Sequence, residues 1–345
     1  MKWIMLIMLV MLVGCSSTND FKVGVIAPLS GNQAFIGTDF KDGFNLDSGL
    51  DVVYQDSQGN VVGAVSAYQQ LRLLDVDAIV LVGVGDEAVL ELADKDSLPL
   101  LLTVSSTGGL PAKSEYVFRY FTNADSDAPL IASYAVNELE LESFGVLHIV
   151  DNFGYSYANV FENEIVELGG EVSLVESFQY TDYEYRTQLL KLAETEMDAL
   201  YIIGLDYQLA EVLKEVEELN VGVQILSLGT IATDYAIGLA EGTAEGVYTT
   251  AFCTDGTPEE YKKRFVAAYE REPGFFSELG NDLAMFIDIS NDGEFIQNML
   301  ALESVEANTG IVSSDENGEL IMPVCVKKIT EGKILNLESG QYYNN

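Results

Sequence analysis

Short apolar runs alternate with amphipathic stretches through the first part of the chain. The apolar runs are 21–27, 52–56, 78–82 and 100–104, and each is followed by Gly, Pro or Ser. The stretches between them carry apolar residues at helical spacing. Continuous apolar strands separated by amphipathic helices are typical of a parallel sheet that is covered on both faces. The pattern therefore predicts a doubly wound α/β unit.

The same alternation starts again after about residue 125. Strands are predicted at 145–150, 171–175, 199–203 and 224–227, with amphipathic helices between them. Two consecutive doubly wound units are therefore expected, which agrees with a chain longer than one hydrophobic core usually serves.

The last segment, 253–345, is predicted to be helix-rich up to about residue 304. After it, a type I turn with a glycine fits 314–318, as part of a hairpin between a strand at 310–312 and a strand at 324–329. This tail is too short for a third domain, so we expect it to complete the first two units.

The N-terminus has the layout of a secretory signal peptide, with one basic residue before an apolar run, 3–13, that ends in small residues. The run is shorter than the roughly 20 residues that span a bilayer. Its end at Cys15 resembles a bacterial lipobox, in which the cysteine is lipidated and becomes the mature N-terminus. We therefore expect a signal peptide at 1–14 and a lipidated tether at 15–20. A plain signal peptide or an uncleaved anchor is the alternative.

Acidic residues far outnumber basic ones, with 55 Asp and Glu against 17 Lys and Arg and a formal net charge of −38. Nucleic-acid binding needs a basic face, so this function is disfavoured. An anionic membrane surface would repel the chain, so attachment would depend on the lipid. The acidic excess favours solubility, and capture of metal cations is the weaker interpretation because the acids are dispersed without metal-ligand spacing.

Sequence motifs of catalysis are missing. The single histidine, His148, lies in an apolar strand and is interpreted as a core residue. The glycine-containing loop 83–88 lacks the third glycine of a dinucleotide site, and its two acids would repel a pyrophosphate. There is no GxSxG elbow, no phosphate-binding loop and no Cys/His cluster, so we predict no enzyme, no cofactor and no metal.

In open α/β sheets, ligands bind beyond the carboxyl ends of the strands, at the point where the strand order reverses. Loops expected there are rich in Gly, Ser, Thr and aromatic residues, and comprise 28–37, 83–87, 105–109, 151–157, 204–208 and 229–234. Hydroxyls and free helix N–H groups suit a small polar or anionic ligand. For Ser105 and Ser106, helix capping is the alternative role.

Several segments together resemble the leucine/isoleucine/valine-binding type of solute-binding proteins that serve ABC importers. The matching segments are 23–31, 35–37, 54–59, 116–119 with Asp127, 151–154, 168–172 and 244–251. The resemblance implies the type I periplasmic binding protein fold, α/β with two doubly wound parallel-sheet lobes joined by a three-segment hinge. The crossings would fall near residues 122, 252 and 322. Lobe 1 would comprise 21–122 and 253–322, and lobe 2 would comprise 123–252 and 323–345.

The resemblance also implies ligand contacts from both lobes. Ser105 and Ser106 correspond to the loop that holds a ligand carboxylate. Ile36 corresponds to a residue that covers the ligand, and Phe153 to an aromatic residue of the second lobe. The family's serine contact after the third strand has no secure equivalent, although Gly85 and Asp86 lie nearby.

Two further positions depart from the family pattern. Leu205 stands where the family has a tyrosine. The acid that pairs with a ligand ammonium aligns near Gly229 and Thr230, which carry no charge. Asp86 or Asp206 is the candidate substitute, since a buried ammonium requires a paired charge. Without such an acid, an α-amino acid is disfavoured as the ligand.

Cys253 and Cys325 would lie beside the second and third crossings. A hinge disulfide and two buried free thiols are both compatible with this placement.

The function that the resemblance implies is an extracytoplasmic, membrane-anchored lipoprotein of the periplasm or cell surface. It would be a monomer that closes on a small polar solute, an amino acid or an amide, and delivers it to an ABC permease. A ligand-sensing module of a signalling system is one alternative. A surface hydrolase that uses Ser106 is another.

Overall fold

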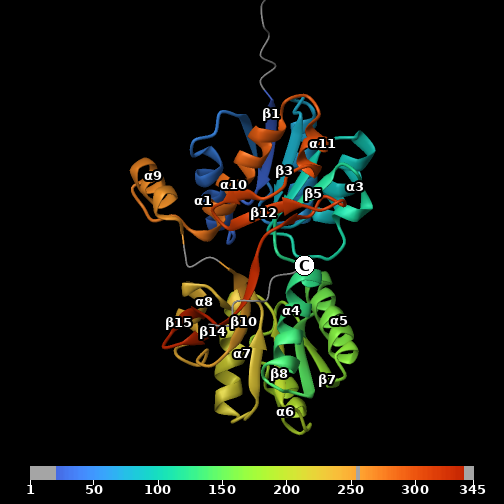
Figure 1. The fold of residues 1–345 in the computed structure, drawn as a ribbon, viewed down its shortest axis with the longest axis vertical. Helices are drawn as coiled ribbons and strands as arrows, with labels where there is room; N and C mark the ends of the chain where they lie inside the picture. The colour runs from blue at the N-terminus through green and yellow to red at the C-terminus, as the bar shows by residue number, and fades with distance from the viewer. Residues whose placement is uncertain (1–20, 254–256, 338–345) are drawn as a thin grey trace, which may run out of the picture.

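The structure, a computed structural model, describes residues 21–253 and 257–337 and has two lobes stacked along its long axis (Figure 1). The first lobe holds a five-stranded parallel sheet in the order β2-β1-β3-β4-β5. The second holds a seven-stranded sheet in the order β15-β14-β10-β9-β8-β6-β7. A small sheet, β11-β12-β13, belongs to the first lobe. The α/β fold of two doubly wound lobes is therefore confirmed.

The first lobe is built around the buried strands β1 and β3, whose Val, Ile and Leu side chains pack against helices on both faces. Its strands are β1 (Lys22–Ala27), β2 (Asp51–Asp56), β3 (Ala78–Val82), β4 (Leu100–Thr103), β5 (Val117–Arg119), β11 (Val305–Ala307), β12 (Gly310–Ser314) and β13 (Leu320–Ile321). Its helices are α1 (Ala34–Asn45), α2 (Val61–Arg72), α3 (Asp86–Asp96), a 3₁₀ turn at Pro111–Lys113, α9 (Glu259–Tyr269), α10 (Phe275–Ser290) and α11 (Phe295–Leu300).

The second lobe has one apolar core on each face of its sheet. Its strands are β6 (Ser143–Ile149), β7 (Glu171–Phe178), β8 (Ala199–Ile203), β9 (Gln224–Ser227), β10 (Tyr248–Phe252), β14 (Val324–Thr330) and β15 (Lys333–Asn336). Its helices are α4 (Ala124–Asn137), α5 (Asn152–Glu167), α6 (Arg186–Ala193), α7 (Asp206–Glu218), a 3₁₀ turn at Gly229–Ile231 and α8 (Asp234–Leu239). His148 on β6 is 4% exposed and lies in this lobe's interior.

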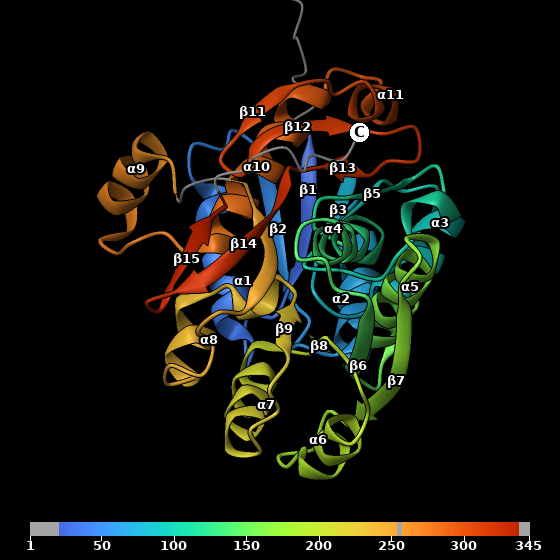
Figure 2. The same cartoon turned by 60° about the horizontal axis from the view of Figure 1, so that its bottom comes forward.

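The expected C-terminal hairpin is wrong in its second strand. The turn at 314–318 joins β12 to β13, and Ser314 pairs with Leu320. Strand β14 instead lies between β10 and β15 in the sheet of the other lobe, antiparallel to both (Figure 2). The local pattern located the strand at 324–329, but its partner is far away in the sequence.

Three connections join the lobes: β5 to α4, β10 to α9, and β13 to β14. A disulfide links Cys253 to Cys325, with their Cα atoms 5.0 Å apart. The Cys253 N–H also donates to the carbonyl of Pro323 at 3.0 Å. The second and third connections are therefore held together covalently, whereas the lobe boundaries expected near 122, 252 and 322 stay predictions.

No helix within residues 21–253 and 257–337 is long and apolar enough to cross a membrane. The predicted signal peptide at 1–14, the tether at 15–20 and the lipidation site Cys15 lie outside the described residues.

The first lobe buries an acidic side chain whose loss of hydration is poorly compensated by hydrogen bonds. Glu278 on α10 is 7% exposed, and the Thr257 hydroxyl donates to its carboxylate. Burial raises the pKa of Glu278 to about 7, with a smaller contribution from nearby Asp282. Asp282 itself accepts hydrogen bonds from the Tyr120 hydroxyl and from two backbone N–H groups.

Glu278→Gln should therefore stabilise the protein above neutral pH. A raised pKa means that the folded state holds the proton more tightly, so stability is lost as the pH rises from about 4.5 to about 7. At pH 8 the substitution should raise the free energy of unfolding by at most about 3 kcal/mol, with little effect at pH 4. Urea unfolding across this pH range, with the exposed Glu303→Gln as control, measures the difference. If the free energy of unfolding depended on pH in the same way in both variants, the raised pKa of Glu278 would be contradicted.

Reduction of the Cys253–Cys325 disulfide should destabilise the chain. The two cysteines are 72 residues apart, and releasing a loop of this length costs about 4 kcal/mol by the chain-entropy estimate. Unfolding should therefore occur at lower denaturant concentration with a reductant present. A Cys253→Ser/Cys325→Ser double variant should show the lower stability under both conditions. Two titratable free thiols in the untreated, native protein would refute the pairing.

Candidate functional site

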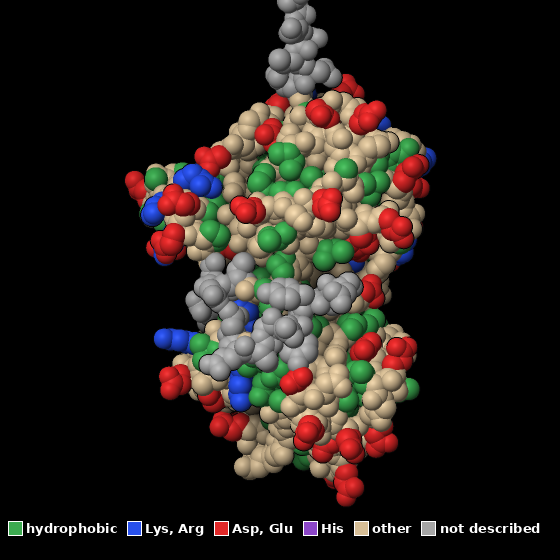
Figure 3. All heavy atoms as spheres, in the orientation of Figure 1, with side chains coloured by type: hydrophobic (Ala, Val, Ile, Leu, Met, Phe, Trp, Pro, Cys, Tyr) green, Lys and Arg blue, Asp and Glu red, His purple; other side chains and the backbone are tan. Residues whose placement is uncertain are grey.

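The carboxyl edges of the two sheets face each other. Strands β5 and β10 each run directly into a connection between the lobes, at residues 119 and 252. The other strands of the first lobe's main sheet, and β9, β8 and β6 of the second, run parallel to them. All of these strands therefore end toward the opposite lobe. The molecule narrows to a waist at this level (Figure 3).

Each sheet has one point where the strand order reverses. In the first lobe it lies between β1 and β3, and in the second between β6 and β8. The loops that follow these four strands therefore border the crevice in which open α/β sheets bind ligands. We call the space between the two sets of loops the cleft.

In the first lobe, a side-chain hydrogen bond links the loops after β3 and β4. The Ser105 hydroxyl donates to the Asp86 carboxylate at 2.7 Å, and Ser105 is 5% exposed. Asp86 is the first residue of α3, and Gly85 precedes it with a φ of 101°. No helix begins at 105–107, so the capping alternative for this loop is wrong. Sequence reasoning placed Asp86 and Ser105 at the same site but did not foresee their bond.

The loop after β4 begins with a strained residue. Val104 has a φ of 54°, which is rare for a β-branched side chain. The Ser106 carbonyl accepts from the Ala124 N–H at 3.4 Å, across the first connection between the lobes. Among the described residues, the Ser106 hydroxyl has no hydrogen-bond partner, and Ser106 is half-buried.

Ile36 lies in the first turn of α1, where it is half-buried against the core of the first lobe. The neighbouring Phe35 is 60% exposed, and its ring meets that of Phe276 edge to face, with centroids 6.1 Å apart. The family pattern pointed to Ile36 and missed Phe35, which presents more apolar surface to solvent.

In the second lobe, Phe153 lies in the first turn of α5 and is half-buried between the two cores. Leu205 precedes α7, and its N–H donates to the side chain of Gln208. The Thr230 hydroxyl donates to the carbonyl of Gly204 at 2.8 Å and so ties the loops after β8 and β9. Gly229 begins the 3₁₀ turn that contains Thr230.

Asp206 is the first residue of α7, and its carboxylate accepts from the Tyr207 N–H at 2.8 Å. Burial raises the pKa of Asp206, and this one hydrogen bond only partly opposes the effect. The carboxylate is thus partly removed from water with little compensation from the protein.

One contact between the lobes was not foreseen. The Gly108 N–H, in the loop after β4, donates to the Ser156 hydroxyl of α5 at 3.4 Å. Gly108 also lies against the Asp125 carboxylate, which would be 2.7 Å from a Cβ at that position. Among the described residues, no hydrogen bond or ion pair links the predicted site residues of one lobe directly to those of the other.

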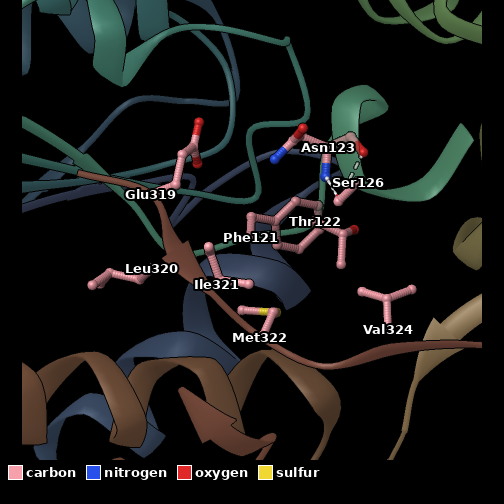
Figure 4. Close-up of a pocket in the computed structure, with 9 residues that line it drawn as sticks. All are labelled: Phe121, Thr122, Asn123, Ser126, Glu319, Leu320, Ile321, Met322 and Val324. Atoms are coloured by element: carbon pink, nitrogen blue, oxygen red, sulfur yellow. Dashed lines mark hydrogen bonds between the residues drawn. The ribbon is translucent and has the colours of Figure 1, made fainter. Parts of the chain in front are cut away.

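A separate cavity of about 40 Å³ lies beside the first and third connections. Figure 4 shows the side chains of Phe121, Ile321 and Met322 gathered around it. It is large enough for one or two water molecules and too small for an organic solute. This cavity belongs to the hinge and not to the cleft.

Two glycines at the cleft allow a helix to approach the end of a strand closely. A Cβ on Gly37 in α1 would lie 2.2 Å from the carbonyl oxygen of Pro28, just beyond β1. A Cβ on Gly154 in α5 would lie 1.9 Å from the carbonyl oxygen of Ile149, the last residue of β6. Both glycines therefore allow a close approach that positions a cleft loop, one in each lobe.

A family model for periplasmic binding proteins matches residues 20–287. No curated protein sequence matches the chain. Among solved structures, a leucine-binding protein from Thermotoga maritima is similar, with a TM-score of 0.80 and 21% identity over 92% of this chain and 97% of that one.

Two ligand complexes are also similar. A branched-chain amino acid transporter substrate-binding protein from Streptococcus pneumoniae, in complex with isoleucine, has a TM-score of 0.79 and 19% identity over 91% of this chain and 97% of that one. A solute-binding protein from R. palustris, in complex with benzoate, has a TM-score of 0.79 and 20% identity over 92% of this chain and 95% of that one. At such low identity these likenesses show the fold, and the two ligands differ in chemical class.

Gly154→Ala should destabilise the protein and disturb the cleft. The added methyl group would force the start of α5 away from β6, at a cost of about 1–3 kcal/mol. Gly238→Ala in α8 is the matched control, because a Cβ there meets nothing within 4 Å. This control should stabilise the protein by about 0.5–1 kcal/mol. Thermal unfolding compares the two, and equal stabilities would show that the close approach is not required.

Proposed function

The chain belongs to the periplasmic binding protein family, and on this premise we propose that it captures a small polar solute between its lobes and delivers it to an ABC permease. The observation that carries the proposal is the orientation of the two sheets, whose carboxyl edges border one cleft from opposite sides. Loops that carry hydroxyls, carboxylates and aromatic rings then reach the same solute from both lobes.

The hinge supports closure as the response to a solute. A solute that contacts both lobes makes more contacts when the lobes are together, so it shifts the equilibrium toward the closed form. The loop that contains Gly108 contacts α5 through Ser156, and its Ser106 carbonyl accepts from the Ala124 N–H beside the first connection.

The side chains at the cleft favour binding over catalysis. The Nδ1 atom of buried His148 lies 2.8 Å from the Ile149 carbonyl oxygen, and its ring packs beside Tyr155. The partner of Ser105 is a carboxylate that starts a helix. No histidine therefore stands ready to activate a serine in the part of the chain described here.

A lipid on Cys15 would anchor the protein by the end of the first lobe. The described chain begins at Phe21, one residue before β1, on the side away from the second lobe (Figure 1). The segment from Cys15 to Phe21 spans at most about 20 Å when fully extended. The anchor would thus leave the cleft and both lobes outside the membrane.

A solute of the correct class should raise the melting temperature and compact the protein. At a concentration 100 times its Kd, it adds about 2.7 kcal/mol to the free energy of unfolding. Thermal-shift measurements with amino acids, amides, amines and small carboxylates identify it. Solution scattering, with and without the solute, then tests for a smaller radius of gyration.

The Gly238→Ala variant is the control for both measurements. Gly238 lies outside the cleft loops, so this variant should bind the solute and become compact as the unmodified protein does. Stabilisation without compaction would contradict closure between the lobes. Absence of any stabilising solute would overturn the proposed binding function.

A further inference from the structure

The loop after β4, residues 104–109, meets the second lobe through its backbone. The Ser106 carbonyl accepts from the N–H of Ala124, the first residue of α4. The Gly108 N–H donates to the Ser156 hydroxyl of α5. We call this segment the β4 loop. It lies at the carboxyl edge of the first lobe's sheet and contacts two helices of the second lobe, so its position affects any solute held between the lobes.

The β4 loop begins in a conformation that its surroundings must hold in place. Val104 has a φ of 54°, and a β-branched residue rarely adopts a positive φ. Residues in sparsely populated backbone regions persist only where neighbouring contacts fix them. The contacts that hold the β4 loop therefore determine where its two serines, Ser105 and Ser106, lie.

Arg119, the last residue of β5, supplies one of these contacts. Its Nη1 atom donates to the carbonyl of Thr107, in the middle of the β4 loop. The Arg119 side chain is fully buried, although it carries a charge. Hydrogen bonds from a charged donor are stronger than those between neutral groups. A buried guanidinium is thus bonded directly to the backbone of the β4 loop.

Glu319 fixes the direction in which this guanidinium points. The Nε atom of Arg119 donates to one carboxylate oxygen of Glu319 at 2.9 Å, and Nη2 donates to the other. A pair with two parallel bonds holds the plane of the guanidinium, which leaves Nη1 directed at Thr107. Glu319 stands directly before β13, the strand that leads into the third connection between the lobes.

The backbone around Glu319 is itself fixed against β5. The Arg119 N–H donates to the carbonyl of Gly318 at 3.0 Å. A Cβ on Gly318 would lie 2.6 Å from the carbonyl oxygen of Val117, so only glycine allows this approach. The Glu319 N–H donates to the Asp315 carboxylate at 2.8 Å. The turn between β12 and β13 therefore lies closely against β5 and presents Glu319 to Arg119.

A buried ion pair can also serve the fold alone. Such a pair often adds little net stability, because the loss of hydration offsets the attraction. This role accounts for the two bonds to Glu319, but it does not require an arginine, since a lysine could neutralise the same carboxylate. A lysine has no planar fork that reaches two partners in fixed directions. The bond to Thr107 is what the arginine adds.

We propose that Arg119 is a positioning residue for solute binding: it holds the β4 loop through Thr107, and Glu319 keeps it in the orientation that this bond requires. This inference rests on the proposed solute-binding function, although the holding of the loop can be measured without a solute. Arg119 acts through the loop backbone and does not touch the solute.

The arrangement connects a loop of the cleft to the hinge through one side chain. Arg119 is bonded to the β4 loop on one side and to the turn before β13 on the other. A loop that is already ordered loses less conformational entropy when a solute binds to it. Loss of the Thr107 bond should therefore weaken solute binding while the sheet that carries the loop stays intact.

Hydrogen exchange on the full chain without solute tests the holding role. In Arg119→Lys, the amides of 104–109 should exchange at least about tenfold faster, while those of β3 should exchange as in the unmodified protein. Arg72→Met is the matched control, because Arg72 pairs with Asp96 at 2.9 Å in the same lobe, at the last residues of α2 and α3. It should leave the exchange of the β4 loop unchanged.

Three results of this comparison would overturn the inference. They are unchanged exchange in the β4 loop of Arg119→Lys, equally faster exchange in the loop and in β3, and an equal change in the Arg72→Met control. The second result would mean that Arg119 serves only the stability of the whole lobe.

A double variant answers the same question if Arg119→Lys does not fold. Arg119→Met/Glu319→Gln removes both charges, so neither is left buried without a partner. Its urea midpoint should lie nearer to that of the unmodified protein than the midpoint of Arg119→Met alone, yet its β4 loop should still exchange faster. Slow exchange of the loop in the folded double variant would show that the Thr107 bond is not required and would overturn the inference.

Calorimetry then tests the effect on binding. The probes are L-leucine, L-isoleucine, leucinamide and benzoate, with any other panel member that raises the melting temperature. A probe that binds the unmodified protein should bind Arg119→Lys at least about tenfold more weakly, and Arg72→Met equally well. Equal affinities despite a loosened loop would overturn the role in binding. If no probe binds the unmodified protein, the proposed function fails, and hydrogen exchange still decides whether Arg119 holds the loop.

Discussion

Strands β5 and β10 end at the connections between the lobes, and this single constraint determines which edge of each sheet faces the other. The parallel strands of the two main sheets share the direction of β5 and β10, so the loops at the carboxyl ends of these parallel strands are directed toward the opposite lobe. The strand order then reverses beside β1 in one lobe and beside β6 in the other, which leaves a crevice in each. The cleft is thus a consequence of chain topology, and the side chains of the loops decide what it accepts.

Those loops have hydroxyls, carboxylates and tyrosines, and they lack cationic side chains. The two similar structures with printed ligands hold isoleucine and benzoate, so the fold itself accepts solutes of different charge. The charge of the solute must therefore follow from the side chains of each cleft. In this chain, Asp86 and Asp206 each begin the helix that follows the third strand of their unit.

The sequence was sufficient to predict most strands, because a buried parallel strand is a continuous apolar run that can be recognised locally. It was not sufficient for pairings between distant segments. The partner of β14 and the bond from Ser105 to Asp86 depend on which segments meet after folding. The disulfide from Cys253 to Cys325 depends on the pairing of β10 with β14, so a count of cysteines left it open.

The loops expected at the carboxyl ends of the strands lie there in the structure, whereas the burial of their individual side chains was not predicted. Positions taken from the family, such as Ile36 and Phe153, are half-buried against the cores, while Phe35, the neighbour of Ile36 in the sequence, is exposed. Burial depends on packing that periodicity does not resolve. The roles of the predicted residues in binding, and the lobe boundaries, remain predictions.

A crystal structure of the protein with its tightest-binding solute tests the central claim most directly. Solute density is expected between the carboxyl edges of the two sheets, in contact with the loops after β3 and β4 and with those after β6 and β8. Density confined to one lobe, or bound on another surface, would contradict it.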